Sequence, residues 1–150
     1  MINQPKLKPS ALTNKYELLK DFEITVNGVN VVVPQYFRYD GATIPFAAWQ
    51  ITFTPFHPDV MMPALVHDWL FYNHQVSRKD ADNILYTLLC QNGVDNLRAN
   101  MIWGAVRAGG KFFWDNDEDD NAYLRTLYEL VRNNKNVDKY RFPPEIFNDE

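Results

Sequence analysis

The segment from Ala64 to Tyr72 is almost entirely apolar, yet His67 and Asp68 stand side by side in its middle. A helix that is apolar on all sides is buried on all sides. Because burying an ionisable side chain without a polar partner is costly, both side chains need partners from other parts of the chain. Any fold of this chain must therefore bring polar groups to His67 and Asp68.

Two polar stretches, one on each side of this segment, are the candidate partners. The first is a turn at Asp40–Gly41, followed by Thr43, and the glycine allows the positive φ angle that such a turn requires. The second begins at Ser77, which is typical of a helix N-cap, with Asp80 three positions later. The sequence favours a site built from these two stretches and the apolar segment between them.

Asp82 is the acidic residue of the second stretch that is best placed to contact His67. At about 100° per residue, Asp82 lies at one edge of the apolar stripe of this helix, and Asp80 lies at the opposite edge. The stripe consists of Ala81, Ile84, Leu85, Leu88 and Leu89. We therefore expect Asp82 to reach toward a packed neighbour.

The composition is that of one globular domain. Of the 150 residues, 46% are hydrophobic and 15% are aromatic, which is enough for one real core. The net charge of -4 argues against a general nucleic-acid-binding protein, because such proteins usually have a basic surface. The one cysteine, Cys90, excludes an internal disulfide. We expect no signal peptide and no transmembrane segment, because no run reaches the ~18 apolar residues of a membrane span.

The N-terminal part predicts an extended arm followed by a β-hairpin. Residues 1–14 are polar and interrupted by prolines, as in an arm. Two segments, 21–26 and 29–33, are joined by Asn27–Gly28, a dipeptide typical of a two-residue hairpin turn. Residues 35–63 have no stable period and predict irregular structure.

Three or four helices are expected to follow the hairpin. They cover about 63–73, 77–92, 95–108 and 122–132. In the third of these helices, five apolar residues are expected to face inward: Leu97, Met101, Ile102, Ala105 and Val106.

These elements predict an α+β fold that is mostly helical, with the N-terminal hairpin packed on three or four helices. The arm at 1–14 precedes a single globular domain at 15–132, and a tail at 133–150 ends the chain. The acidic run at 115–120 lacks the glycine and glutamate spacing of a helix-flanked calcium loop, so we interpret it as a solvated loop.

The pair His67 and Asp68 suggests two chemical roles. A neutral histidine that is held by a carboxylate is a general base near neutral pH. On a helix, the neighbouring carboxylate points about 100° away, so it can serve separately as a ligand of a divalent cation. Asp82 is then the candidate for the carboxylate that orients His67, whereas His57 and His74 are interpreted as ordinary surface histidines.

The motifs resemble those of an uncharacterised, mostly phage-encoded family, domain-of-unknown-function family 1353. The matching motifs are Asp-Gly-Ala-Thr-Ile-Pro at 40–45, His-Asp-Trp-Leu at 67–70 and Ala-Asp at 81–82, where the family shows D-G-A-S-I-P, H-D-W-L-Y and A-D. The resemblance covers roughly 37–107. It implies a phage-encoded protein in the cytoplasm of the host bacterium or in the virion, with other phage structural proteins as candidate partners.

The same two helices also resemble the catalytic helix pair of phospholipase A2. This resemblance implies that His67 is the base that activates water, that Asp82 supports it and that Asp68 binds Ca²⁺. Asp40 and Gly41 lie in the stretch of this sequence that is most similar to the calcium-binding loop of those enzymes. The substrate would be a lipid or another ester.

Three functions are therefore open. The first is a phage-encoded, calcium-assisted ester hydrolase with His67 and Asp82 as catalytic residues and with Asp68, Asp40 and Gly41 at the metal. The second is a non-enzymatic virion component, such as a tail, neck or capsid accessory protein, in which the same network is structural. The third keeps an enzyme but places Zn²⁺ or Mg²⁺ on Asp40, His67 and Asp68.

Overall fold

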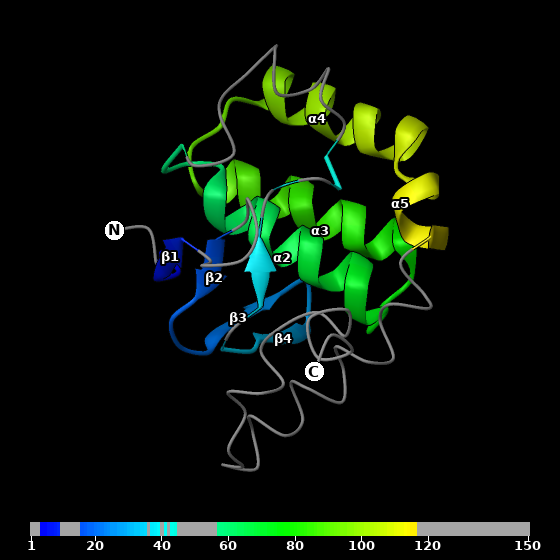
Figure 1. Cartoon of the computed structure of the whole chain (residues 1–150). Helices are drawn as coiled ribbons and strands as arrows, with labels where there is room; N and C mark the ends of the chain where they lie inside the picture. The colour runs from blue at the N-terminus through cyan, green and yellow to red at the C-terminus, as the bar shows by residue number, and fades with distance from the viewer. Residues whose placement is uncertain are drawn as a thin grey trace.

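The fold is α+β and mostly helical, as predicted, with strands in the N-terminal part and helices after them (Figure 1). The computed structural model describes residues 4–9, 16–35, 37–39, 41, 43–44 and 57–116. The predicted helix at 122–132 and the tail at 133–150 lie outside the described residues, as does most of the acidic run.

The predicted hairpin is confirmed. Strands β3 (Phe22–Val26) and β4 (Val29–Val33) pair antiparallel, with Val26 opposite Val29. The two turn residues have positive φ angles, 50° at Asn27 and 76° at Gly28, which is the backbone of the two-residue turn that matches strand twist. The Asn27 side chain also donates a hydrogen bond of 3.1 Å to Thr87 on a later helix, so the turn is fastened to the helical layer.

A second sheet was not predicted. It consists of β1 (Leu7–Pro9), β2 (Tyr16–Leu18) and β5 (Arg38–Tyr39), in the order β1-β2-β5, with both pairs antiparallel. Strands of two or three residues are too short to show a clear alternation of polar and apolar residues. β1 lies in the segment that the sequence predicts as an arm.

Four helices follow within the described residues: α2 (Met61–Asn73), α3 (Arg78–Gln91), α4 (Asn96–Gly109) and α5 (Lys111–Asn116). The predicted Ser77 cap is present, because the Ser77 side chain accepts a hydrogen bond from the backbone N–H group three residues later. The next helix could begin with a cap at Asp95 or Asn96 by its sequence, and the cap is Asp95, whose side chain accepts from the Arg98 N–H. α2 packs against α3, and α3 packs against α4. Figure 1 shows α2 and α3 between the β3–β4 hairpin and α4.

α2 is the central element of the core. All residues from Met62 to Tyr72 are buried, including His67 and Asp68. Pro63 falls in the first turn, where its missing N–H would have no partner within the helix. The expectation of a helix that is enclosed on all sides is therefore correct.

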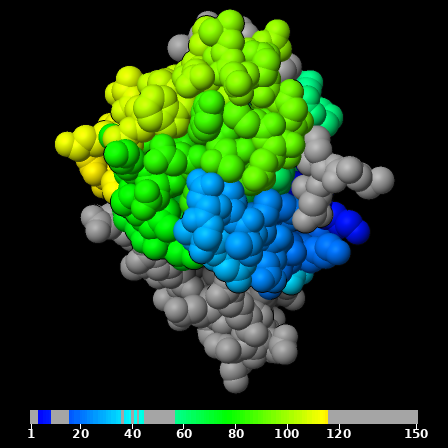
Figure 2. Space-filling view, turned by 180° about the vertical axis from the view of Figure 1, so that it is seen from behind, coloured from blue at the N-terminus to red at the C-terminus, as the bar shows by residue number. Residues whose placement is uncertain are grey.

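α4 lies at the edge of the core, and its inward face is narrower than predicted. Leu97 is 72% exposed and Met101 is 39% exposed, so the prediction that both face inward is wrong. The buried residues are Ala99, Ile102 and Val106. Because α4 has α3 as its main helical neighbour, one stripe of small and branched side chains is enough for the contact, and Figure 2 shows the outer side of α4 at the surface. None of the helices in the described ranges is both long enough and apolar enough to cross a membrane.

Gly110, between α4 and α5, sits in a crowded corner. A β-carbon at this position would collide with the carbonyl oxygen of Val106. It would also lie 3.3 Å from Phe71 Cζ and 3.4 Å from Arg78 Nη1. The absence of a side chain here therefore lets α2, α3 and α4 approach one another.

We predict that Gly110→Ala lowers the free energy of unfolding by about 1–3 kcal/mol, which is the usual cost of overpacking. Gly104→Ala is the matched control, because no atom lies within 4 Å of a β-carbon added there. That variant should gain up to about 1 kcal/mol from helix propensity. Urea unfolding measures both changes, and equal effects of the two substitutions would contradict the crowding at Gly110.

Candidate functional site

His67 lies at the centre of a buried hydrogen-bond network. Its ring is completely buried, and both ring nitrogens have partners. Nε2 lies 2.7 Å from Asp82 Oδ1 on α3, and Nδ1 lies 2.9 Å from the hydroxyl oxygen of Thr43 in the turn before α2. The predicted contact between His67 and Asp82 is therefore present.

Asp82 is held by two arginines as well as by His67. Its second oxygen accepts a hydrogen bond of 2.9 Å from Arg107 Nη1 on α4, and Arg78 Nη1 lies 3.7 Å away. Arg78 also donates to the carbonyl oxygens of Val106 and Arg107, each at 3.3 Å. The positive charges compensate the buried carboxylate, and they link α3 to the end of α4.

Asp68 fastens the turn to α2. Its Oδ2 accepts a hydrogen bond of 2.9 Å from the Gly41 N–H, and its Oδ1 accepts one from the Thr43 hydroxyl. Gly41 has a φ angle of 74°, which favours glycine over residues with a side chain. The network thus runs without a gap from the turn through α2 and α3 to α4.

The structure brings together four of the five predicted site residues: His67, Asp82, Asp68 and Gly41. Asp40 lies outside the described residues. Sequence reasoning missed Thr43, which stood in the recognised turn motif but was taken only as part of the turn. It also missed Arg107, which in sequence is one basic residue in the last turn of a helix and gives no sign of reaching Asp82.

The buried position sets the protonation of His67. Burial lowers the pKa of the ring below its ordinary value of 6.5, and the positive charge of Arg78 acts in the same direction. The hydrogen bond and the charge of Asp82 raise the pKa, but they are smaller than the effect of burial. His67 is therefore neutral near pH 7 and has one nitrogen that can accept a hydrogen bond.

The hydroxyl of Thr43 faces two acceptors with one hydrogen. It donates to Asp68 Oδ1 in one rotamer, and rotation about the Cβ–Oγ1 bond aims the same hydrogen at His67 Nδ1. Asp82 on Nε2 favours the tautomer in which Nε2 carries the proton and Nδ1 is the acceptor. Thr43 therefore connects the hydrogen bonds of Asp68 to those of His67.

The oxygens of Asp68 and of the Gly41 carbonyl accept hydrogen bonds from the protein itself. The two oxygens of Asp68 face an N–H group and an O–H group, and the carbonyl oxygen of Gly41 accepts the N–H of Ile44 at 3.1 Å. Calcium needs six to eight oxygen ligands. Calcium binding at Asp68, Asp40 and Gly41 stays a prediction, and Asp40 lies outside the described residues.

The other two histidines lie apart from the network. His57 Nδ1 accepts a hydrogen bond of 3.2 Å from the Asp59 N–H, and the His57 side chain is 37% exposed. The ring of His74 stacks on Trp114, with ring centres 3.7 Å apart. These contacts of the two rings are with Asp59 and Trp114 rather than with the network around His67.

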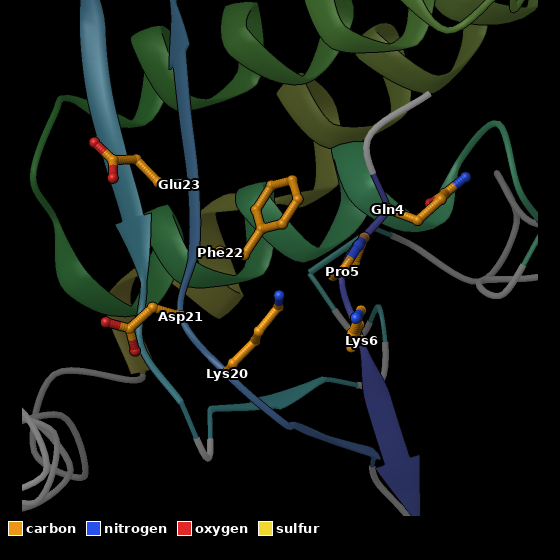
Figure 3. Close-up of a pocket in the computed structure, with 7 residues that line it drawn as sticks. All are labelled: Gln4, Pro5, Lys6, Lys20, Asp21, Phe22 and Glu23. Carbon is orange, nitrogen blue, oxygen red and sulfur yellow. The ribbon is translucent and has the colours of Figure 1, made fainter. Parts of the chain in front are cut away.

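A pocket of about 230 Å³ also lies away from the network, next to β1 and the start of β3 (Figure 3). Its lining residues are Gln4, Pro5, Lys6, Lys20, Asp21, Phe22 and Glu23. The carboxylates of Asp21 and Glu23 are already engaged, by the Gln35 N–H and by the Asn30 side chain. None of the seven lining residues belongs to the network around His67.

Comparison with known proteins identifies relatives but no characterised one. The model of the family described as "Protein of unknown function (DUF1353)" matches residues 16–106. Two uncharacterized proteins of Sinorhizobium fredii are similar to this chain: y4jT, 30% identical over 96 residues, and y4iH, 28% identical over 97 residues. Each alignment covers 63% of this chain but only 29% and 41% of the respective relative. The chain thus spans less than half of either protein, and no solved structure matches it.

We predict that Asp68→Asn costs less than about 1 kcal/mol, whereas Asp68→Ala costs about 1–3 kcal/mol because it leaves the Gly41 N–H without its acceptor. An asparagine can accept from Gly41 with its oxygen and donate to Thr43 with its nitrogen. Urea unfolding of the two variants gives both values. An equal loss for Asn and Ala would show that the charge of Asp68, rather than its hydrogen bonds, stabilises the turn.

We also predict that acid destabilises the protein through His67. The folded pKa is lowered, so below the ordinary value of 6.5 the unfolded chain takes up a proton that the folded chain does not. The free energy of unfolding is thus highest above pH 6.5 with respect to this group, and it falls as the pH drops toward the lowered folded pKa. NMR of the ring of His67 at pH 6 tests this directly, because a charged imidazolium at that pH would contradict the prediction.

Proposed function

The chain belongs to the DUF1353 family of proteins of unknown function, and we propose that it is a phage-encoded ester hydrolase with His67 as its general base. The observation that carries the proposal is the contact of 2.7 Å between His67 Nε2 and Asp82 Oδ1, with the second Asp82 oxygen held by Arg107. A base oriented by a carboxylate, with a hydroxyl on its other nitrogen, is the arrangement that acyl-transfer enzymes use.

Each member of this arrangement has a role in proton transfer. Asp82 fixes the tautomer of His67 and stabilises the imidazolium that forms when the ring accepts a proton. Arg107 keeps the Asp82 carboxylate in place. Because burial lowers the pKa of His67, the ring is neutral and ready to accept a proton at neutral pH.

The substrate class and the metal come from the resemblance to phospholipase A2. We propose a lipid ester or a similar ester as the substrate, and a host-cell or virion location follows from the resemblance to phage proteins. Calcium dependence stays a prediction, and the arrangement of donors around Asp68 gives it no support. An assay of ester hydrolysis with Ca²⁺ and with a chelator separates a calcium-dependent from a calcium-independent hydrolase.

The burial of the network favours a second candidate, a non-enzymatic component of a phage particle. His67 and Asp82 have no exposed surface, and the hydrogen bonds join the turn, α2, α3 and α4. A network of this kind also serves to fix one arrangement of helices. In this candidate, His67 matters for stability and not for turnover.

We predict that the protein releases fatty acid from mixed phospholipid vesicles, or nitrophenol from nitrophenyl esters, and that His67→Gln lowers kcat about 10²–10⁴-fold, the usual contribution of a general base. His57→Gln is the matched control, because His57 lies outside the network, and its rate should equal that of the wild type. Asp82→Asn, which preserves the shape of the side chain, should also lose activity.

The outcomes separate the two candidates. Loss of turnover in His67→Gln, with circular dichroism showing a folded chain, supports the hydrolase. No turnover of either substrate by the wild type, with or without Ca²⁺, overturns it. If His67→Gln then also unfolds at lower urea than His57→Gln, the structural role of the network is the one that remains.

A further inference from the structure

Thr43 occupies the position at which His67 would hold a water molecule. A histidine that activates water needs a free ring nitrogen next to the reacting centre. Here Nε2 is bonded to Asp82, and the Thr43 hydroxyl oxygen lies 2.9 Å from Nδ1. The oxygen that His67 can activate in this arrangement therefore belongs to the protein.

The exposure of the individual side chains in the network also favours Thr43 as the group that His67 activates. His67 and Asp82 have no exposed surface, whereas Thr43 and Asp68 are each 6% exposed. The Arg78 and Arg107 side chains at the other end of the network are 21% and 29% exposed, but behind them Asp82 is fully buried. Of the four side chains His67, Asp82, Thr43 and Asp68, a substrate that approaches from solvent can thus touch only the last two. Of these two, Thr43 carries a hydroxyl that can act as a nucleophile.

We propose that Thr43 is a nucleophile, that His67 is its base and Asp82 the carboxylate that orients the base, and that acyl esters react through an acyl-threonine intermediate. This inference rests on the proposed ester hydrolase but assigns it a covalent mechanism. The distances of 2.9 Å and 2.7 Å on the two sides of the His67 ring are those of a nucleophile, base and carboxylate in hydrogen-bond contact.

The reaction balances without a co-reactant other than water. Thr43 Oγ1 forms a bond to the ester carbonyl carbon while its proton moves to His67 Nδ1. The carbon–oxygen bond to the alcohol then breaks, and the alcohol leaves with the proton from Nδ1. Water next attacks the acyl-threonine, Nδ1 accepts a proton from that water, and the carboxylic acid leaves as the proton returns to Oγ1.

Asp68 is a positioning residue in this mechanism. It holds the hydroxyl of Thr43 close to the ring in the rotamer that donates to Oδ1, and a bond rotation is enough to redirect the hydrogen to His67. The Gly41 N–H holds the other oxygen of Asp68 at 2.9 Å, so the carboxylate cannot turn away. Proton transfer from Thr43 to His67 therefore requires only this rotation of the hydroxyl.

The first test is covalent labelling, which does not depend on turnover. The wild type is incubated with a fluorophosphonate probe and digested, and mass spectrometry should find the label on Thr43. Thr43→Ser should keep the label, and Thr43→Val and His67→Gln should lose it. Wild-type protein that remains unlabelled at Thr43 overturns the inference, whatever the assays of ester hydrolysis show.

The second test is the pre-steady-state burst with nitrophenyl acetate. The wild type and Thr43→Ser should release about one nitrophenol per protein before the steady state, and Thr43→Val should lose the burst and slow turnover at least about 10²-fold. Thr25→Val is the matched control on the exposed face of β3, and its burst should be unchanged. Thermal unfolding of each variant shows whether it is folded.

The failures of the two proposals are distinguishable. If His67→Gln abolishes hydrolysis while Thr43→Val retains it without a burst, the hydrolase stands, and its nucleophile is water. If the wild type shows neither hydrolysis nor labelling, both proposals fail. Labelling at Thr43 without turnover of these esters would retain the nucleophile and reject the ester substrates.

Discussion

The structure depends on the hydrogen bond between His67 and Asp82, a polar link inside the buried contact of α2 with α3. An apolar helix can bury an imidazole only if both ring nitrogens find partners, and a buried carboxylate needs positive charge nearby. Asp82 meets both requirements here. One of its oxygens is the partner of the His67 ring, and its other oxygen accepts a hydrogen bond from the positively charged Arg107. The positions of α2, α3 and α4 are therefore coupled through a single carboxylate.

The turn before α2 is part of the same solution. Asp68 is buried beside His67, and it is satisfied by the Gly41 N–H and the Thr43 hydroxyl rather than by another helix. The Asp68 side chain of α2 thus holds the backbone of the turn in its shape. In return, the turn supplies the hydrogen-bond donors that the buried carboxylate of Asp68 needs. A motif of a few residues can hold such an arrangement only with a glycine at the positive φ angle and a hydroxyl two residues later.

Much of this arrangement was predictable from local patterns. The Asn27–Gly28 hairpin, the Ser77 cap and the meeting of His67 with Asp82 follow from turn chemistry, capping and helical periodicity, and all are present. The exposed positions of Leu97 and Met101 were not predictable, because periodicity identifies an apolar face but not whether a neighbour covers it. Thr43 and Arg107 were missed for a related reason: a hydroxyl in a turn and an arginine near a helix end have ordinary local roles, and only the tertiary contacts reveal their partners.

The closed network has a consequence for the motions of the domain. A fluctuation that frees the turn must break the bonds to Asp68, and one that separates α2 from α3 must break the contact of His67 with Asp82. Amide hydrogens in the middle of α2 can then exchange with solvent deuterium only when several segments open together. The last turn of α4 is held by Arg107 and by the two hydrogen bonds from Arg78, whereas residues 96–98 in its first turn are exposed and lie outside this network. Within the described residues, we therefore expect slow exchange around α2 and faster exchange in the first turn of α4.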